Sequence, residues 1–314
     1  MTRDFEFHQL KIAGMHFIIT ADEGIKLSSA DRHKNFRSDG QYPQNPWEHP
    51  IRLFYCDYYP EPDYSPDSIW EASEGDYSWK VFDYIGETVI YVYYPDLEAP
   101  VVLSLNPRRL DKPILINHPG QEVEILKYPL DLILLHYYSI PAELIMVHAS
   151  GFVMNNTGYL CLGRSGSGKT TLTKLVTDTE GKRIQDDRLF IRKEDSDWFM
   201  YPVPLNEGDQ QCKARIDRIL TLNHSSSNQI IPVNDEQRTT LFLPHISHFP
   251  KWRNNYLYQM ILSEQLLKNT RFHQFFFLPN QSAVTHLYNN GQDLSPHPIS
   301  TGKLLQSQAD DQRV

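Results

Sequence analysis

Near the middle of the chain, from Gly163 to Thr170, lies the octapeptide GRSGSGKT. The octapeptide fits the pattern G-x-x-x-x-G-K-[ST], whose spacing lets successive backbone N–H groups point inward at the oxygens of a phosphate. Apolar YLCL precedes it and TLTKLV follows it, so we expect a strand, the loop and a helix in that order. This context makes a glycine-rich linker a poor alternative.

The residue types of this loop suit a nucleotide such as ATP. Glycines can adopt backbone angles that are closed to other residues, and the helix that begins near Lys169 directs its positive end at the phosphates. Lys169 supplies a mobile cation for the β- and γ-phosphates, and the hydroxyl of Thr170 can bind Mg²⁺. The predicted nucleotide-binding residues are Gly163, Arg164, Ser165, Gly166, Ser167, Gly168, Lys169, Thr170 and Thr171.

Two adjacent carboxylates follow the loop, separated from it by one predicted helix. Asp186 and Asp187 lie in RIQDDRLFIR, which reads as one strand, and a strand end there would lie beside the loop, as in a β-α-β unit. One carboxylate can hold Mg²⁺, and the other can accept the proton of an attacking hydroxyl. A solvated turn at a strand start is the alternative, which the neighbouring loop disfavours. Arg188 follows the pair and can form an ion pair with it.

Composition and charge narrow the class of protein. The chain has 314 residues, of which 40% are hydrophobic and 22% charged, as in an ordinary soluble protein of about two domains. The net charge is −9 without a dense run of Lys and Arg. This argues against nucleic acid as a partner, because phosphate contacts need a basic surface. The sequence has no apolar run of about 18 residues, so we expect no membrane span.

The cysteines and the first residues indicate a reducing compartment. Cys56, Cys161 and Cys212 form no C-x-x-C pair, so we expect neither a zinc site nor a disulfide framework. The opening MTRDFEFHQLKIAG lacks the apolar core of a secretion signal. We therefore expect a cytoplasmic protein, and the sequence leaves a homo-oligomer open.

Residues to about Val123 are rich in the β-branched and aromatic types that favour strands. IGE is expected to be a hairpin turn, and the proline-rich segments GQYPQNPWEHP and YYPEPDYSPDS are expected to be loops. We expect a β-rich recognition domain over 1–125, a nucleotide-binding catalytic domain over 126–302 and a tail over 303–314. The predicted strands of the first domain are LKIAGMHFIIT, IRLFYCDYY, YSWKVFDYIGETVIYVYY and VVLSLN.

The second part of the chain mixes helices and strands without strict alternation. A buried helix and a buried strand are expected in PLDLILLHYYSIPAELIMVHA, and HASGFVM and YLCLG should pair as a hairpin through NNTG. Antiparallel strands directly before a phosphate loop are atypical of doubly wound NTPases such as Ras-like or ABC-type cores. Further strands are predicted in DWFMYPVP, IDRILTLN, NQIIPV and RFHQFFFLP, and helices in DEQRTTLFLPHI, NNYLYQMILSEQLLKNT and SAVTHLYN.

Three motifs in this order resemble the catalytic domain of HPr kinase/phosphorylase, namely VHASGFV, GRSGSGKT and QDDR. The chain is more similar still to the HPr-kinase-like proteins, some of which phosphorylate peptides in biosynthetic clusters such as those of lasso peptides. The resemblance covers roughly residues 140 to 300. It implies an α/β fold with a mixed sheet, akin to that of phosphoenolpyruvate carboxykinase. It also implies an ATP- and Mg²⁺-dependent kinase that acts on a hydroxyl, most often that of serine.

The resemblance implies roles for five residues. His148 matches the family histidine near the transferred phosphate, although a core histidine on a buried strand is the plain alternative. Lys169 and Thr170 match the loop lysine and its metal-binding hydroxyl residue. Asp186 and Asp187 match the aspartates of metal binding and base catalysis, and the sequence does not distinguish which one is the base.

The chain departs from the family pattern after the aspartates. VPLNEGDQQCKARIDR stands where a Glu-x-Arg-Gly-type signature is expected, so neither HPr itself nor a phosphorylase reaction follows from the resemblance. Lys213 and Arg215 could neutralise phosphate charge or form the polar face of an exposed strand. A peptide or protein kinase is the function predicted, with a small-molecule kinase or a nucleotide-sensing module as alternatives. A sensor would not need the two aspartates.

Overall fold

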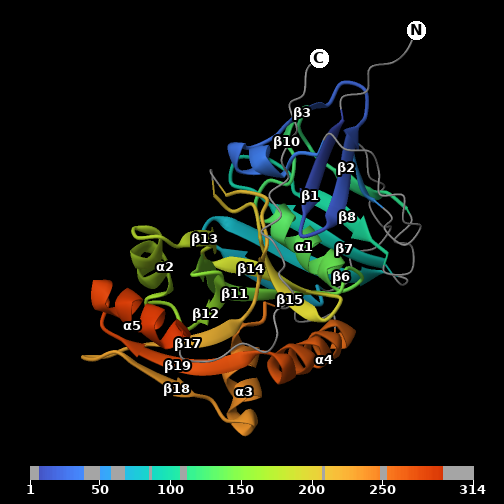
Figure 1. Cartoon of the computed structure of the whole chain (residues 1–314). Coiled ribbons are helices and arrows are strands. Elements are labelled where there is room, and N and C mark those ends of the chain that lie inside the picture. The colour runs from blue at the N-terminus through green and yellow to red at the C-terminus, as the bar shows by residue number, and fades with distance from the viewer. Residues whose placement is uncertain are drawn as a thin grey trace. The chain divides into compact units, whose positions relative to one another are not determined.

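The computed structural model of the chain describes residues 7–38, 50–57, 68–84, 87–106, 112–206, 209–247 and 253–292. The chain divides into two compact units (Figure 1). Unit 1 comprises Met1–Tyr137 with Asn206–Gly208, and unit 2 comprises Tyr138–Leu205 with Asp209–Val314.

Unit 1 is built on a mixed sheet of eight strands, in the order β1-β2-β4-β9-β8-β7-β6-β5. Strands β2, β4 and β9 are parallel neighbours, and the other neighbours are antiparallel. Strands β3 and β10 form a separate parallel pair. The elements are β1 His8–Ile12, β2 Met15–Ala21, β3 Lys26–Ser28, η1 Asp31–Phe36, β4 Ile51–Cys56, β5 Trp70–Glu74, β6 Tyr77–Tyr84, β7 Glu87–Tyr93, β8 Val101–Leu105, β9 Ile114–Asn117, β10 Glu122–Glu124 and α1 Leu130–Ser139.

The strands predicted for the first part of the chain are confirmed where the structure describes them, whereas β3, β5, β9 and β10 were not predicted. LKIAGMHFIIT is two strands, because Ala13 and Gly14 have positive φ and turn the chain back between β1 and β2. Residues 85–86 of the IGE turn lie outside the described residues, although Tyr84 and Glu87 on either side are register partners. Most residues of the two proline-rich segments also lie outside the described ranges.

Unit 2 is built on a second mixed sheet, of nine strands, in the order β16-β15-β14-β11-β12-β17-β19-β18, with β13 also paired to β11. Strands β12, β17 and β19 are parallel neighbours. The elements are β11 Leu144–Met154, β12 Thr157–Leu162, α2 Lys169–Thr177, β13 Lys182–Gln185, β14 Arg188–Glu194, β15 Asp197–Pro202, β16 Ala214–Arg215, β17 Arg218–His224, β18 Gln229–Pro232, α3 Asp235–Phe242, η2 Leu243–His245, α4 Arg253–Asn269, β19 Arg271–Phe277 and α5 Gln281–Gln292.

The hairpin predicted before the phosphate loop is confirmed. Strands β11 and β12 pair antiparallel through a two-residue turn at Asn155 and Asn156, whose φ angles are 51° and 57°. A turn with positive φ at both central residues matches the right-handed twist of the flanking strands. The hairpin therefore delivers β12 to the start of the phosphate loop with β11 as its neighbour.

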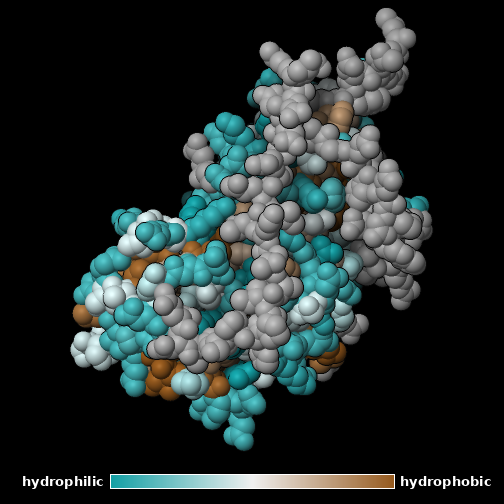
Figure 2. All heavy atoms as spheres, in the orientation of Figure 1, coloured by the Kyte–Doolittle hydropathy of each residue, from teal (hydrophilic) through white to brown (hydrophobic). Residues whose placement is uncertain are grey.

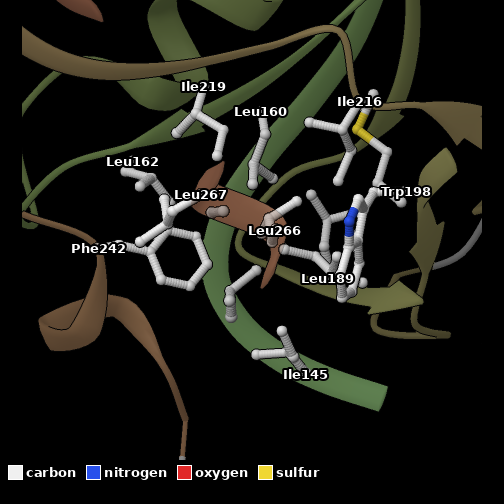
Figure 3. Close-up of a cluster of buried hydrophobic side chains, with 14 of the residues drawn as sticks. Ile145, Leu160, Leu162, Leu189, Trp198, Ile216, Ile219, Phe242, Leu266 and Leu267 are labelled. Carbon is white, nitrogen blue, oxygen red and sulfur yellow. The ribbon is translucent and has the colours of Figure 1, made fainter. Parts of the chain in front are cut away.

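Helices cover both faces of the unit 2 sheet. Alternate residues of its strands therefore pack into two separate apolar clusters. Leu160 and Leu162 pack in a cluster with Phe242 of α3 and Leu266 of α4 (Figure 3). Tyr159 and the other intervening residues pack with α2 and α5. On the face drawn in Figure 2, hydrophilic side chains make up most of the coloured surface, as expected where the apolar side chains are buried.

The segment predicted as one strand, RIQDDRLFIR, is two strands. Both β13 and β14 pair antiparallel with β11. Between them the strand conformation is interrupted at Asp186 and Asp187, where φ of Asp187 is +89°. In an unbroken strand, adjacent side chains point to opposite faces. The break lets both aspartates line one cleft. Helix α5 is also longer than the predicted SAVTHLYN, and the tail over 303–314 lies outside the described residues.

Candidate active site

Residues 163–168, the predicted phosphate loop, connect the end of β12 to the start of α2, as expected from the sequence. Gly168 precedes the helix with φ +94°, and Gly166 has φ +77°. A Cβ atom at Gly168 would lie 2.6 Å from Cζ of Phe277. Only glycine fits at Gly168, because the position combines left-handed backbone with a close neighbour.

A cleft of about 260 Å³ lies over this loop. The four residues predicted to be catalytic, His148, Lys169, Asp186 and Asp187, all line it. Three of the predicted nucleotide-binding residues do not line the cleft, namely Gly163, Arg164 and Ser167. The full lining is His148, Ser165, Gly166, Gly168, Lys169, Thr170, Thr171, Asp186, Asp187 and His224.

Lys169 is buried under the loop that it belongs to, with 8% of its surface exposed. Its Nζ donates to the carbonyl oxygens of Gly163 at 2.7 Å and Arg164 at 3.3 Å. Burial lowers the pKa of the amine, while the charges of Asp187 and Asp186 oppose that change. The loop carbonyls therefore hold the ammonium at the wall of the cleft.

Asp187 is the most strongly paired carboxylate of the cleft. Its Oδ1 lies 3.0 Å from Nδ1 of His148, and its Oδ2 lies 3.6 Å from Nε of Arg188. The hydrogen bond from His148 lowers the pKa of this carboxyl, against the effect of partial burial, and Arg188 adds to the lowering. Because the backbone N–H of Ala149 also donates to the Asp187 carbonyl at 3.0 Å, both ends of the residue are fixed.

A buried polar network supports the aspartate pair from behind. Gln185 is fully buried, and its Oε1 accepts the backbone N–H of Asp186 at 3.0 Å. Its Nε2 donates to Oδ2 of Asp209 at 3.1 Å. Asp209 is 2% exposed and also accepts from Arg183 at 3.1 Å. This contact of Asp209 could not be predicted from the sequence, because it joins residues 24 positions apart in the chain.

Two histidines, one lining the cleft and one beside His148, were not singled out from the sequence. His224 ends β17 and its Nε2 lies 3.0 Å from the carbonyl oxygen of Gly166. His245 precedes Ile246, which bridges Val147 in antiparallel fashion, so the register brings His245 opposite His148. Burial lowers the pKa of His245 to about 4, and the charges of Lys169 and His148 act in the same direction. For His224, the available signal was its place directly after the predicted strand IDRILTLN.

Lys213 and Arg215 lie on or beside β16 and do not line the cleft. Lys213 pairs with Glu194 and lies 4.5 Å from the centre of the Phe199 ring. Arg215 pairs with Asp217 at 2.5 Å. Both cations are therefore engaged by neighbouring carboxylates.

Oxygen ligands suited to Mg²⁺ gather in the cleft, as the hydroxyl of Thr170 and the carboxylates of Asp186 and Asp187 all line it. Over the ranges that the structure describes, no group of three or more His, Cys, Asp or Glu could by itself hold a metal ion. Magnesium sites for nucleotides commonly use one or two carboxylates and complete the set with phosphate oxygens and water.

Among the described helices, none combines the length and apolar character of a membrane span.

No family model and no curated protein matches the chain. Among solved structures, the Hpr(Ser) kinase/phosphatase from Coxiella burnetii matches over 46% of this chain and 95% of its own chain, with 11% sequence identity and a TM-score of 0.29. A likeness at this TM-score is too weak to establish a shared fold or activity.

Proposed function

We propose that this protein is an ATP-dependent kinase that transfers the γ-phosphate to a hydroxyl group of a peptide or protein, in particular that of a serine. The observation that carries the proposal is the 3.0 Å contact between His148 and Asp187 in the same cleft as Lys169 and the phosphate loop. The loop alone would serve a motor, a switch or a kinase. A carboxylate oriented by a histidine beside the phosphates favours proton transfer from an acceptor.

The phosphate loop would hold the triphosphate of ATP. Backbone N–H groups of the loop and of the first turn of α2 are donors for phosphate oxygens. Nζ of Lys169 now donates to two neutral carbonyl oxygens. A phosphate oxygen would be a stronger, charge-assisted acceptor for the same ammonium.

Mg²⁺ fits the oxygen-rich part of the cleft. Thr170 and Asp186 would hold it, because they offer a hydroxyl and a carboxylate while Asp187 is already paired with His148. When bound, the ion would neutralise phosphate charge and fix the orientation of the phosphates.

Asp187 is the residue that we assign as the base. The acceptor oxygen attacks the γ-phosphorus in line, the bond from that phosphorus to the bridging oxygen breaks, and ADP leaves. The hydroxyl proton passes to the carboxylate of Asp187, which its lowered pKa keeps ionised and His148 keeps oriented. Lys169 stabilises the charge that spreads over the phosphate oxygens.

The ordered motifs VHASGFV, GRSGSGKT and QDDR support an HPr-kinase-like fold, related to phosphoenolpyruvate carboxykinase, as our proposal for unit 2. Recognition of the acceptor is assigned to the β-rich unit 1. We also propose that the protein acts in the cytoplasm. Its partner would be the peptide or protein that it phosphorylates, and neither a nucleic acid nor a membrane.

The test is mass spectrometry of candidate acceptors, namely the peptides and proteins encoded beside this protein, after incubation with the enzyme, Mg²⁺ and ATP. We expect one added phosphate on a hydroxyl side chain, and none with the Lys169→Ala variant. The double variant Asp186→Asn/Asp187→Asn should still bind ATP and should fail to transfer phosphate.

The other outcomes identify the alternatives. Full transfer by the double variant would show that the aspartates have no role and would contradict the proposal. Phosphorylation of a metabolite would indicate a small-molecule kinase. Tight ATP binding without transfer to any acceptor would indicate a nucleotide sensor.

A further inference from the structure

Three parallel strands of unit 2 end around the phosphate loop. Strand β12 leads into the loop, β17 ends at His224, and β19 ends at Phe277. His224 and Phe277 are register partners in the β17–β19 pair. Ligands of open α/β sheets bind beyond the carboxyl ends of parallel strands, so His224 stands where a ligand held by the loop would extend.

The ring of His224 is held in place on two sides. It stacks on the ring of Phe277, with centroids 5.3 Å apart and planes 29° apart, and its Nε2 lies 3.0 Å from the carbonyl oxygen of Gly166. Phe277 is fully buried and stacks in turn on the buried Phe275 at 5.4 Å. The support below His224 is therefore rigid, and the residue is preorganised before any ligand arrives.

His224 itself is exposed and lines the cleft. Within the lining of this cleft, all of which lies in described parts of the chain, His148 and His224 are the two residues with flat rings. His148 is engaged by Asp187 at 3.0 Å. His224 is therefore the lining ring that remains available to a second flat group.

We infer that His224, supported by Phe277, is the platform on which the base of the bound nucleotide stacks while the phosphate loop holds its phosphates. This rests on the proposed function, in that the ligand is a nucleoside triphosphate. Because stacking on a flat ring tolerates any base, the platform would add affinity without selecting strongly among nucleotides. With this platform, the protein would bind a nucleotide more tightly than it binds the phosphate chain alone.

The experiment compares ATP with inorganic tripolyphosphate, which carries the phosphates without a base. Isothermal titration calorimetry with Mg²⁺ would give the Kd of each ligand for the full chain, for His224→Ala and for His224→Phe. We expect His224→Ala to weaken ATP binding about tenfold and to change tripolyphosphate binding by less than about twofold. His224→Phe keeps a flat ring and should bind ATP nearly as tightly as the wild type.

Two outcomes would overturn the inference. Equal weakening of both ligands by His224→Ala, with the same loss in His224→Phe, would show that His224 only orders the loop through the Gly166 carbonyl. Equal affinity of the wild type for ATP and tripolyphosphate would show that no base is held, while leaving the phosphate site intact. If the wild type bound neither ligand, the proposed function itself would be wrong, and this inference would fall with it.

Discussion

Asp187 combines an unusual backbone conformation with a paired carboxylate. Its φ of +89° costs a residue with a Cβ atom about 1 kcal/mol. The contacts to His148, Arg188 and the backbone N–H of Ala149 hold it there. Such conformations persist where the surroundings over-determine them, and they cluster at functional sites.

Substitution of Asp187 by Asn should separate chemistry from folding. Asn tolerates positive φ, so Asp187→Asn should change the free energy of unfolding by less than about 1 kcal/mol. Phosphate transfer should fall on the order of a hundredfold or more, because the base is lost. Urea unfolding and transfer assays measure the two effects.

A matched control is Asp195→Asn, at another aspartate with positive φ, 51°, in the turn between β14 and β15 and away from the cleft lining. It should leave transfer unchanged. Equal transfer by the Asp187→Asn variant and the control would contradict the role of Asp187.

We propose that Asp209 positions the aspartate pair through Gln185. Asp209→Asn should weaken a buried charged hydrogen bond and lower the free energy of unfolding by about 1–3 kcal/mol. Because the aspartate pair loses its support while the phosphate loop is untouched, kcat should fall and the Kd for ATP should stay the same. A parallel loss of ATP affinity would assign Asp209 a general structural role instead.

At the scale of elements, the phosphate loop depends on how closely α2 and β19 approach each other. The Cβ of an alanine at Gly168 would meet Phe277 at 2.6 Å, whereas a Cβ at Gly166 would meet nothing within 4 Å. Both glycines have positive φ. The two positions therefore separate backbone strain from steric conflict.

Gly168→Ala should destabilise unit 2 by about 2–4 kcal/mol, as overpacking adds to the cost of left-handed backbone. Gly166→Ala should cost only about 1 kcal/mol, from the backbone alone. Thermal or urea unfolding of the two variants, in parallel, checks the difference. Equal destabilisation would mean that the contact with Phe277 is not tight in solution.

Local patterns were sufficient to predict the elements around the loop. The NNTG turn, the apolar β12 and the helix that begins at Lys169 each follow from short-range residue preferences. The break at Asp187 could not be predicted, because it depends on contacts from β11. His224, His245 and Asp209 reach the site through strand pairing and buried hydrogen bonds between distant segments.

Buried and half-buried histidines in both units link folding to pH. His33 of unit 1 is completely buried, and burial, with the charges of Arg32 and Arg37, lowers its pKa to about 3. In unit 2, burial lowers the pKa of His245 and His273 to about 4. Each folded-state pKa is below the unfolded value, so the unfolded chain binds more protons in between.

The free energy of unfolding should therefore be highest above about pH 6.5 and fall as the pH decreases, by at most about 1.4 kcal/mol per pH unit for each histidine. His33→Leu removes one such group. Between about pH 6 and pH 4, the free energy of unfolding of this variant should therefore fall by less than that of the wild type. Urea unfolding at several pH values measures both slopes. Identical slopes would show that His33 is protonated in the folded chain.

We propose that the cleft moves the γ-phosphate of ATP to a hydroxyl acceptor, so the fate of that phosphate is the first quantity to measure. The measurement is the amount of ADP, phosphorylated acceptor and free phosphate formed by the wild type with Mg²⁺, ATP and the peptides and proteins encoded beside it. We expect ADP and phosphorylated acceptor in equal amounts, both dependent on Lys169. ADP matched by free phosphate alone, or no ADP despite tight ATP binding, would contradict the account.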